Sequence, residues 1–324
     1  MNLELKTKIN INRVKEVGSL INNAKNILLV GHKNPDGDTV GCMTALMEYL
    51  KSLDKQYVAF IDDKVPKNLE YLRYSHEIVS DRDSLDNNFD LIIGLDCGDM
   101  RYSGIEDKLM ELKERVKIIN IDHHKSDYGQ INIVDEHSSS TSMILCDIFR
   151  IWGVKISQDM ATSFLAGIVV DTYSFSNSAT SDKSLGLSAE LIEQGGRYGR
   201  VNQELHKNKT KENLRLWSKV LSRLQKNDKL NVAYSLVLAE DIEEIGKEET
   251  EGMSNFFSQM KEARMTMILK EYGSGEIKVS LRAVDDKLDV AELARRFGGG
   301  GHRKAAGFSV YGRLEQEGNG WKII

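Results

Sequence analysis

The chain has 324 residues, of which 40% are hydrophobic and 29% are charged, and its formal net charge is −5. This length favours two domains, and the composition is that of an ordinary globular protein. No apolar run approaches the roughly 20 residues of a membrane span, and the charged N-terminus lacks a signal-peptide pattern, so we expect a cytoplasmic protein without a membrane partner. The net charge excludes a surface that broadly attracts polyanions, so a phosphate substrate needs local cations or bound metal ions.

Short apolar runs alternate with helical patterns in the first half of the chain. The predicted strands are Asn26–Val30, Gln56–Ile61, Leu91–Leu95 and Lys117–Ile121. The predicted helices pass through residues 45–50 and cover Glu106–Arg115, Thr141–Trp152 and Gln158–Val170. Strands that alternate with helices indicate βαβ units and a parallel sheet. Three cysteines, Cys42, Cys97 and Cys146, have no paired spacing, which excludes a disulfide framework and favours buried thiols in a reducing compartment.

The composition changes after Gly195, where basic residues outnumber acidic ones up to residue 229. We expect a catalytic domain over residues 1–194, a linker over 195–213 that runs into a long helix, and a substrate-binding domain over 214–324. The second domain has predicted strands and one helix that ends in a glycine run, which indicates a smaller α/β domain. These elements are Leu230–Leu238, Met265–Glu271, Glu276–Arg282 and the helix Asp289–Phe297.

Four segments place acids or histidines directly after an apolar run. They are His32 to Asp38 (His-Lys-Asn-Pro-Asp-Gly-Asp), Asp96 to Asp99 (Asp-Cys-Gly-Asp), Asp122-His123-His124, and Asp171 at the end of an apolar helix. In open parallel sheets, ligands bind beyond the carboxyl ends of the strands. The first three segments should therefore meet at one edge of the sheet, with Asp171 beside them.

Carboxylates gathered in one crevice repel one another and cannot all ionise unless cations neutralise them. Oxygen ligands mixed with imidazoles suit Mn²⁺ better than Mg²⁺. A pair of divalent ions about 3.5–4 Å apart is the usual clamp for in-line displacement at phosphorus. Taken singly, the same residues also fit structural roles: a polar turn at Asp36–Asp38, helix N-caps at Asp96 and Asp171, and a hydrogen-bonded turn at residues 122–124.

Two motifs together resemble a known family. Asp122-His123-His124, with His32-x-x-x-Asp36-x-Asp38 upstream and Asp171 downstream, resembles the DHH phosphoesterase superfamily. The sequence Gly-Gly-Gly-Gly-His-Arg-Lys-Ala-Ala-Gly at 298–307 is similar to the signature of the first type of DHH-associated domain. The motifs span nearly the whole chain, in family order, at a length typical of bifunctional oligoribonucleases and 3′-phosphoadenosine 5′-phosphate (PAP) phosphatases. This resemblance implies hydrolysis of short RNA oligonucleotides (nanoRNA) to mononucleotides and of PAP to AMP, in a cleft between the two domains.

The resemblance also implies two divalent metal ions as cofactors, with Mn²⁺ as the preferred metal. It further implies a role for each residue. His32, Asp36 and Asp96 would hold the first ion, and Asp38, Asp96, His123 and Asp171 the second, with Asp96 as the bridge. His124 would face the scissile phosphate as an electrophile or proton donor, and Asp122 would orient a histidine. Arg282, Gly299, Gly300, Gly301 and His302 would bind the terminal phosphate and nucleotide, because glycines let backbone N–H groups approach a phosphate and arginine offers a bidentate fork.

Several alternatives remain open. Tyr173 stands where the family commonly has glycine, and Met143 stands near a position that often carries an acid, so the order of substrate preference is open. The chain could also hydrolyse linear dinucleotides left by cyclic dinucleotide turnover, or bind nucleotides or RNA without catalysis. A RecJ-like exonuclease would need further domains, and a family II pyrophosphatase lacks the glycine-histidine signature. The glycine run also fits a helix C-cap, and a homodimer is compatible with the sequence.

Overall fold

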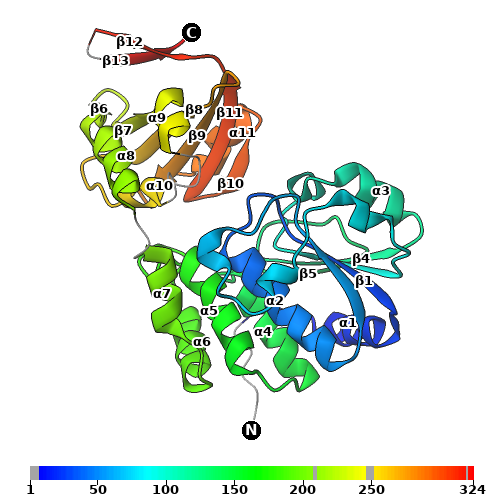
Figure 1. Cartoon of the computed structure of the whole chain (residues 1–324). Helices are drawn as coiled ribbons and strands as arrows, with labels where there is room; N and C mark the ends of the chain where they lie inside the picture. The colour runs from blue at the N-terminus through cyan, green and yellow to red at the C-terminus, as the bar shows by residue number, and fades with distance from the viewer. Residues whose placement is uncertain (1–6, 207–209, 246–251, 319) are drawn as a thin grey trace. The chain divides into compact units, whose positions relative to one another are not determined.

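The structure, a computed structural model, describes residues 7–206, 210–245, 252–318 and 320–324 (Figure 1). The chain divides into two compact units, residues 1–208 and 209–324. This division falls inside the stretch predicted as a linker, of which Tyr198–His206 forms helix α7. Among the described helices, none combines the length and the apolar character needed to cross a bilayer.

A parallel sheet of five strands forms the centre of the first unit (Figure 1). Its order is β2-β1-β3-β4-β5, and every neighbouring pair is parallel. The strands are β1 Asn26–Val30, β2 Gln56–Phe60, β3 Leu91–Leu95, β4 Lys117–Asp122 and β5 Ile131–Val134. The prediction of a parallel sheet is confirmed, and the first four strands agree with their predicted bounds to within one residue.

Apolar side chains cover both faces of this sheet, as is usual for parallel strands. Ile27 and Leu29 of β1 point into the larger core, whereas Leu28 and Val30 point into the smaller one. Helix α3 Glu106–Lys113 contributes to the smaller core. The larger core contains residues of α1 Ile11–Asn23, α2 Gly37–Ser52, α4 Thr141–Trp152, α5 Gln158–Asp171, α6 Asp182–Glu193 and α7. The three cysteines are buried and free, as predicted.

Helices α2 and α5 pack with their backbones in contact, and glycines make this approach possible. A Cβ atom at Gly41 would lie 2.3 Å from the carbonyl oxygen of Ser163, and one at Gly167 would lie 2.2 Å from Asp38 Oδ1. Any larger residue would clash with backbone or with the Asp38 carboxylate. This close packing brings the last turn of α5, which ends in Asp171, beside the first turn of α2.

A mixed sheet of six strands, in the order β10-β11-β9-β8-β7-β6, forms the second unit. Its strands are β6 Gln225–Asn227, β7 Val232–Val237, β8 Met265–Glu271, β9 Glu276–Ala283, β10 Gly300–His302 and β11 Ala305–Tyr311, and only β7 and β8 pair in parallel. Helices α8 Lys211–Ser222, α9 Ala239–Ile245 and α10 Met253–Phe257 pack in one core, and α11 Val290–Arg296 packs in another. The hairpin β12 Leu314–Glu317 and β13 Gly320–Ile323 forms a separate sheet.

A buried ion pair stabilises the second unit. Asp241 in α9 is fully buried and pairs with Arg223, and it also accepts a hydrogen bond from the Leu238 N–H at 3.0 Å. Lys219 Nζ lies 3.3 Å from Asp241 Oδ1. Burial alone would raise the pKa of Asp241, but the hydrogen bonds from Arg223 and Leu238 outweigh it and lower the pKa.

Replacing Asp241 with asparagine should lower the free energy of unfolding of the second unit by about 1.5–3 kcal/mol at pH 7, because hydrogen bonds to an ionised group are lost. Since the pKa of Asp241 is lowered on folding, its contribution is present above about pH 4 and is lost as the pH falls through the lowered pKa. Urea denaturation should therefore show a gap between wild type and Asp241→Asn that closes towards pH 3. The exposed Asp228, exchanged in the same way, serves as the control; a gap independent of pH would contradict the assignment.

Candidate active site

The four predicted segments meet beyond the carboxyl ends of β1, β3 and β4. His32 lies two residues after β1, Asp96 follows β3 directly, and Asp122 is the last residue of β4. The chain continues from β1 to β2 on one side and reaches β3 on the other side of β1. This reversal between β1 and β3 is the switch point at which open α/β sheets bind their ligands.

The ligand atoms of acids and imidazoles form three groups here, each within 4.8 Å. The groups are Asp96-His123-His124, His32-Asp36-Asp96 and Asp38-His123-Asp171. Asp96 and His123 each belong to two groups, so the three groups form one continuous cluster. The structure thus brings together all six predicted metal ligands and His124, and Asp122 contacts His124.

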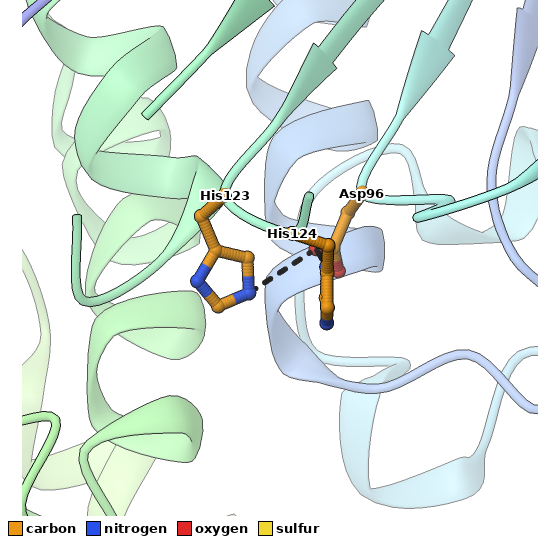
Figure 2. Close-up of side chains that lie close together, drawn as sticks. All are labelled: Asp96, His123 and His124. Atoms are coloured by element: carbon orange, nitrogen blue, oxygen red, sulfur yellow. Dashed lines mark ion pairs between the residues drawn. The ribbon is translucent and has the colours of Figure 1, made fainter. Parts of the chain in front are cut away.

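Asp96 has imidazole nitrogens near both of its oxygens. Asp96 Oδ1 lies 3.6 Å from His123 Nε2 and 3.6 Å from His124 Nδ1, whereas Oδ2 lies 3.6 Å from His32 Nε2. Figure 2 shows the His123 and His124 imidazoles beside the Asp96 carboxylate, and their ring centroids are 4.3 Å apart. A carboxylate surrounded in this way has the arrangement that a ligand shared between two cations requires.

Burial and mutual repulsion oppose ionisation of this cluster. Burial raises the pKa of Asp96 and of Asp171 well above the ordinary value, and repulsion from Asp38 raises both further. The pKa of Asp38 is raised by burial and by Asp36. Asp171 Oδ2 is buried and accepts no hydrogen bond from a described residue, although His123 Nε2 lies 3.3 Å away. Buried carboxylate oxygens that accept no hydrogen bond, together with nearby imidazole nitrogens, are suitable ligands for divalent cations.

Hydroxyl and backbone groups fix two of these acids, and the sequence analysis did not identify them. Thr39 Oγ1 donates to Asp96 Oδ2 at 2.8 Å, and Thr141 Oγ1 donates to Asp96 Oδ1 at 2.9 Å. The first two N–H groups of α4 donate to Asp38, from Thr141 at 2.6 Å and from Ser142 at 2.9 Å. The signal was the Ser/Thr run at 138–142 before an apolar helix, since such runs mark helix N-termini, where anions bind.

The structural alternatives for the acids have different outcomes. Asp36 is the N-cap of α2, and its Oδ1 accepts from the N–H groups of Asp38 and Thr39 at 2.9 and 3.1 Å. Asp171 is the last residue of α5, and Asp96 follows β3 in the left-handed region with φ of 59°. An N-cap role is therefore wrong for Asp96 and Asp171, whereas Asp36 combines a cap with its place in the cluster.

His124 and Asp122 form a hydrogen-bonded pair behind Asp96. His124 Nδ1 donates to Asp122 Oδ1 at 2.8 Å, and the Gly98 N–H donates to the other oxygen of Asp122 at 2.5 Å. Burial alone would raise the pKa of Asp122 and lower that of His124, but their hydrogen bond and charges reverse both shifts. The side chain of His124 is 34% exposed, so its Nε2–H can donate to a ligand at the mouth of the cluster.

The two positions that depart from the family pattern, Tyr173 and Met143, lie in different surroundings. Tyr173, Ser174 and Phe175 follow Thr172, the C-cap of α5, and have φ of 47°, 54° and 62°. This left-handed region favours glycine, which explains a glycine preference at position 173. Met143 is 1% exposed and packs in the larger core.

The predicted substrate-binding residues of the second unit lie in neighbouring strands. Ala305 of β11 is the cross-strand partner of Arg282 in β9 on one side and of His302 in β10 on the other. Arg282 Nε donates to Asn255 Oδ1 at 2.8 Å. Burial lowers the pKa of Arg282 to about 10, which leaves it charged at neutral pH. The side chain of His302 lies outside the described part of the structure.

Local packing accounts for the glycine run. Phe297 is the C-cap of α11, and Gly298 follows it with a φ of 76°; the Gly298 N–H donates to Arg295 O and the Gly299 N–H to Ala294 O. This confirms that the glycine run begins as a helix C-cap motif. A Cβ atom at Gly299 would lie 2.1 Å from Gly307 O, and one at Gly301 2.6 Å from Ala305 O. The binding role of Gly299, Gly300 and Gly301 stays a prediction.

Comparison with known proteins agrees with this geometry. The family model described as "DHH family, N-terminal domain" matches residues 26–168, and the model described as "DHHA1 domain" matches residues 230–319. The chain therefore carries a DHH domain and a DHHA1 domain. Its predicted class, a hydrolase of phosphate esters, is confirmed by these domains and by the relatives.

Three of these relatives cover different parts of the chain. The bifunctional oligoribonuclease and PAP phosphatase NrnA of Thermus thermophilus is 27% identical over 289 residues, which are 88% of this chain and 84% of that protein. An exopolyphosphatase-related protein from Bacteroides fragilis superposes with a TM-score of 0.85 at 26% identity, covering 94% of this chain and 92% of that one. A probable manganese-dependent inorganic pyrophosphatase of Exiguobacterium is 27% identical, but this likeness covers only 52% of this chain and 55% of that protein.

Proposed function

We propose that this DHH enzyme hydrolyses short oligoribonucleotides to mononucleotides, and PAP to AMP. The observation that carries the proposal is the convergence of acids and imidazoles on Asp96 at the switch point of the sheet. Such a cluster suits phosphoester cleavage with two divalent cations. The name of the Thermus thermophilus relative, which spans most of both chains, supports this substrate class.

In this proposal His32, Asp36 and Asp96 hold one cation, and Asp38, Asp96, His123 and Asp171 hold the other. Bound ions neutralise the buried carboxylates, polarise phosphoryl oxygens and activate water at neutral pH. The imidazoles in the ligand set favour Mn²⁺, and the manganese dependence named for the Exiguobacterium relative supports the same metal.

The side chains around the cluster then have separate tasks. Thr39 and Thr141 hold the Asp96 carboxylate in one orientation. Asp122 keeps His124 protonated at Nδ1, so that Nε2–H can donate to a phosphoryl or leaving oxygen. Arg282, His302 and the N–H groups of Gly300 and Gly301 bind a distal phosphate of the substrate, whereas the Gly299 N–H already donates to Ala294 O.

A substrate panel tests this proposal. Di- to pentaribonucleotides, linear diadenylate, PAP and pyrophosphate are incubated with the protein in Mn²⁺ and in excess chelator. We expect mononucleotides from every oligonucleotide and AMP from PAP, no phosphate from pyrophosphate, and no product in chelator. Cleavage of dinucleotides alone would instead favour the linear dinucleotide hydrolase, and binding without turnover would indicate a silent binding module.

A further inference from the structure

An exposed aromatic ring adjoins the glycine run of the second unit. Phe297, directly before Gly298, is 52% exposed. It stacks on Phe308 of β11 with ring centroids 4.6 Å apart and an angle of 15° between the planes. Phe308 packs against the core formed by α11 and the sheet. The inner face of the Phe297 ring is thus fixed, and the exposed half of the side chain is a rigid apolar surface.

This stacked pair is continuous with the backbone that we propose binds a phosphate. A Cβ atom at Gly299 would lie 2.5 Å from Phe308 Cβ, so the glycine backbone rests on the residue that supports the Phe297 ring. The left-handed cap at Gly298 and the hydrogen bond from Phe297 N to Ala294 O, at 2.9 Å, fix the backbone on either side. A phosphate held by the N–H groups of Gly300 and Gly301 would therefore lie close to the stacked pair of Phe297 and Phe308.

The charge of this segment also suits a nucleotide. Residues 293–313 contain Arg295, Arg296, Arg303, Lys304 and Arg313 and no acid, in a chain whose net charge is −5. Arg295 and Arg296 are exposed in the last turn of α11. Arg296 is near Glu292, whereas Arg295 forms no ion pair with a residue that the structure describes. Exposed aromatic rings among cations are the usual means of binding single-stranded nucleic acid without sequence preference.

We propose that Phe297 is a stacking platform for a nucleobase of the substrate, next to the phosphate held by the glycine run. This inference rests on the proposed function and adds a base-binding subsite to it. Because every base has an aromatic face, such a platform would bind all four bases similarly. It would bind a ligand without a base more weakly. The ring is already fixed on Phe308, so little conformational entropy is lost when a base stacks on it.

The alternative is that Phe297 only shields Phe308 from water. Phe297→Leu separates the two ideas, since leucine keeps an apolar cover over Phe308 but offers no aromatic face. Phe297→Tyr and Phe297→Trp keep the face. Tyr311→Leu is the matched control for loss of an exposed aromatic ring, because Tyr311 is 87% exposed and ends β11, the strand that carries Phe308.

The experiment measures the dissociation constants of radiolabelled diadenylate and of an abasic dinucleotide with the same phosphates, by equilibrium dialysis in chelator. Phe297→Leu should weaken diadenylate binding about 5- to 150-fold, the equivalent of about 1–3 kcal/mol for one stacked base. It should leave the abasic analogue unaffected. Phe297→Tyr, Phe297→Trp and Tyr311→Leu should bind diadenylate as the wild type does.

Three results would overturn the platform: equal affinity of the wild type for the two probes, unchanged diadenylate binding by Phe297→Leu, or weak binding by folded Phe297→Trp. The last comparison decides the matter even where the leucine variant does not fold. Because binding is measured without turnover, the platform and the reaction are tested separately. If the wild type cleaves RNA but Phe297→Leu binds diadenylate with unchanged affinity, only the platform is refuted. A protein that binds bases through Phe297 but releases no product refutes only the proposed reaction.

Discussion

Replacing Asp96 with alanine should abolish hydrolysis, with a fall in kcat of at least about 10³-fold, because several kcal/mol of transition-state stabilisation depend on the bound cations. Asp96 is shared between two of the three ligand groups, and imidazoles of His32, His123 and His124 surround it at 3.6 Å. The measurement is turnover of a diribonucleotide in saturating Mn²⁺, together with the number of Mn²⁺ ions bound at equilibrium.

Asp99→Ala in the same loop is the matched control, since Asp99 is 40% exposed and pairs with Arg101. It should keep both turnover and bound metal. A second readout excludes misfolding as the cause. Because burial raises the pKa of Asp96, its ionised form opposes folding at neutral pH, so Asp96→Asn should melt at a higher temperature than the wild type in chelator. Full turnover by Asp96→Ala would refute the site.

Replacing His124 with alanine should lower kcat by about 10²- to 10⁴-fold, the usual contribution of a positioned proton donor. The bond from His124 Nδ1 to Asp122 raises the pKa of the imidazole and directs Nε2 away from that acid. Because six other residues are proposed to hold the cations, the number of bound Mn²⁺ ions should not change. Turnover and Mn²⁺ binding are measured on the same preparations.

The metal count decides between two roles for His124, which also lies within ligand distance of Asp96 and His123. Loss of one bound ion in His124→Ala would make it a ligand and contradict the proton-donor role. Asp122→Asn should reproduce part of the kinetic loss, since it removes the charge that raises the pKa of His124. The exposed His137, replaced by alanine, should have no effect.

The sequence predicted best those elements whose pattern is local and apolar. Strands β1 and β3 have the predicted bounds because each is a continuous apolar run that ends at polar residues. Strand β5 was missed because it has only four residues and Asn132 interrupts its apolar run. The terminal strands β12 and β13 also have only four residues each, and each contains charged residues or glycine. The rule that ligands bind beyond strand ends placed His32, Asp96 and His123 together without any knowledge of side-chain geometry.

What the sequence could not predict depends on packing between distant segments. Asp171 was predicted to lie beside the cluster, but the contact that places it there was not: glycines at 41 and 167 let α5 touch α2. The hydrogen bonds from Thr39 and Thr141 to Asp96 join residues 57 and 45 positions apart. The glycine run was read as a phosphate loop, whereas its residues are first required by the end of α11 and by close contact with β11.

Anomalous X-ray scattering from crystals grown in Mn²⁺ shows directly whether Asp96 joins two cations. We expect two manganese peaks about 3.5–4 Å apart, with Asp96 between them, His32 and Asp36 at one ion, and Asp38, His123 and Asp171 at the other. No peak within bonding distance of Asp96, with its oxygens bound only to the hydroxyls of Thr39 and Thr141, would contradict it.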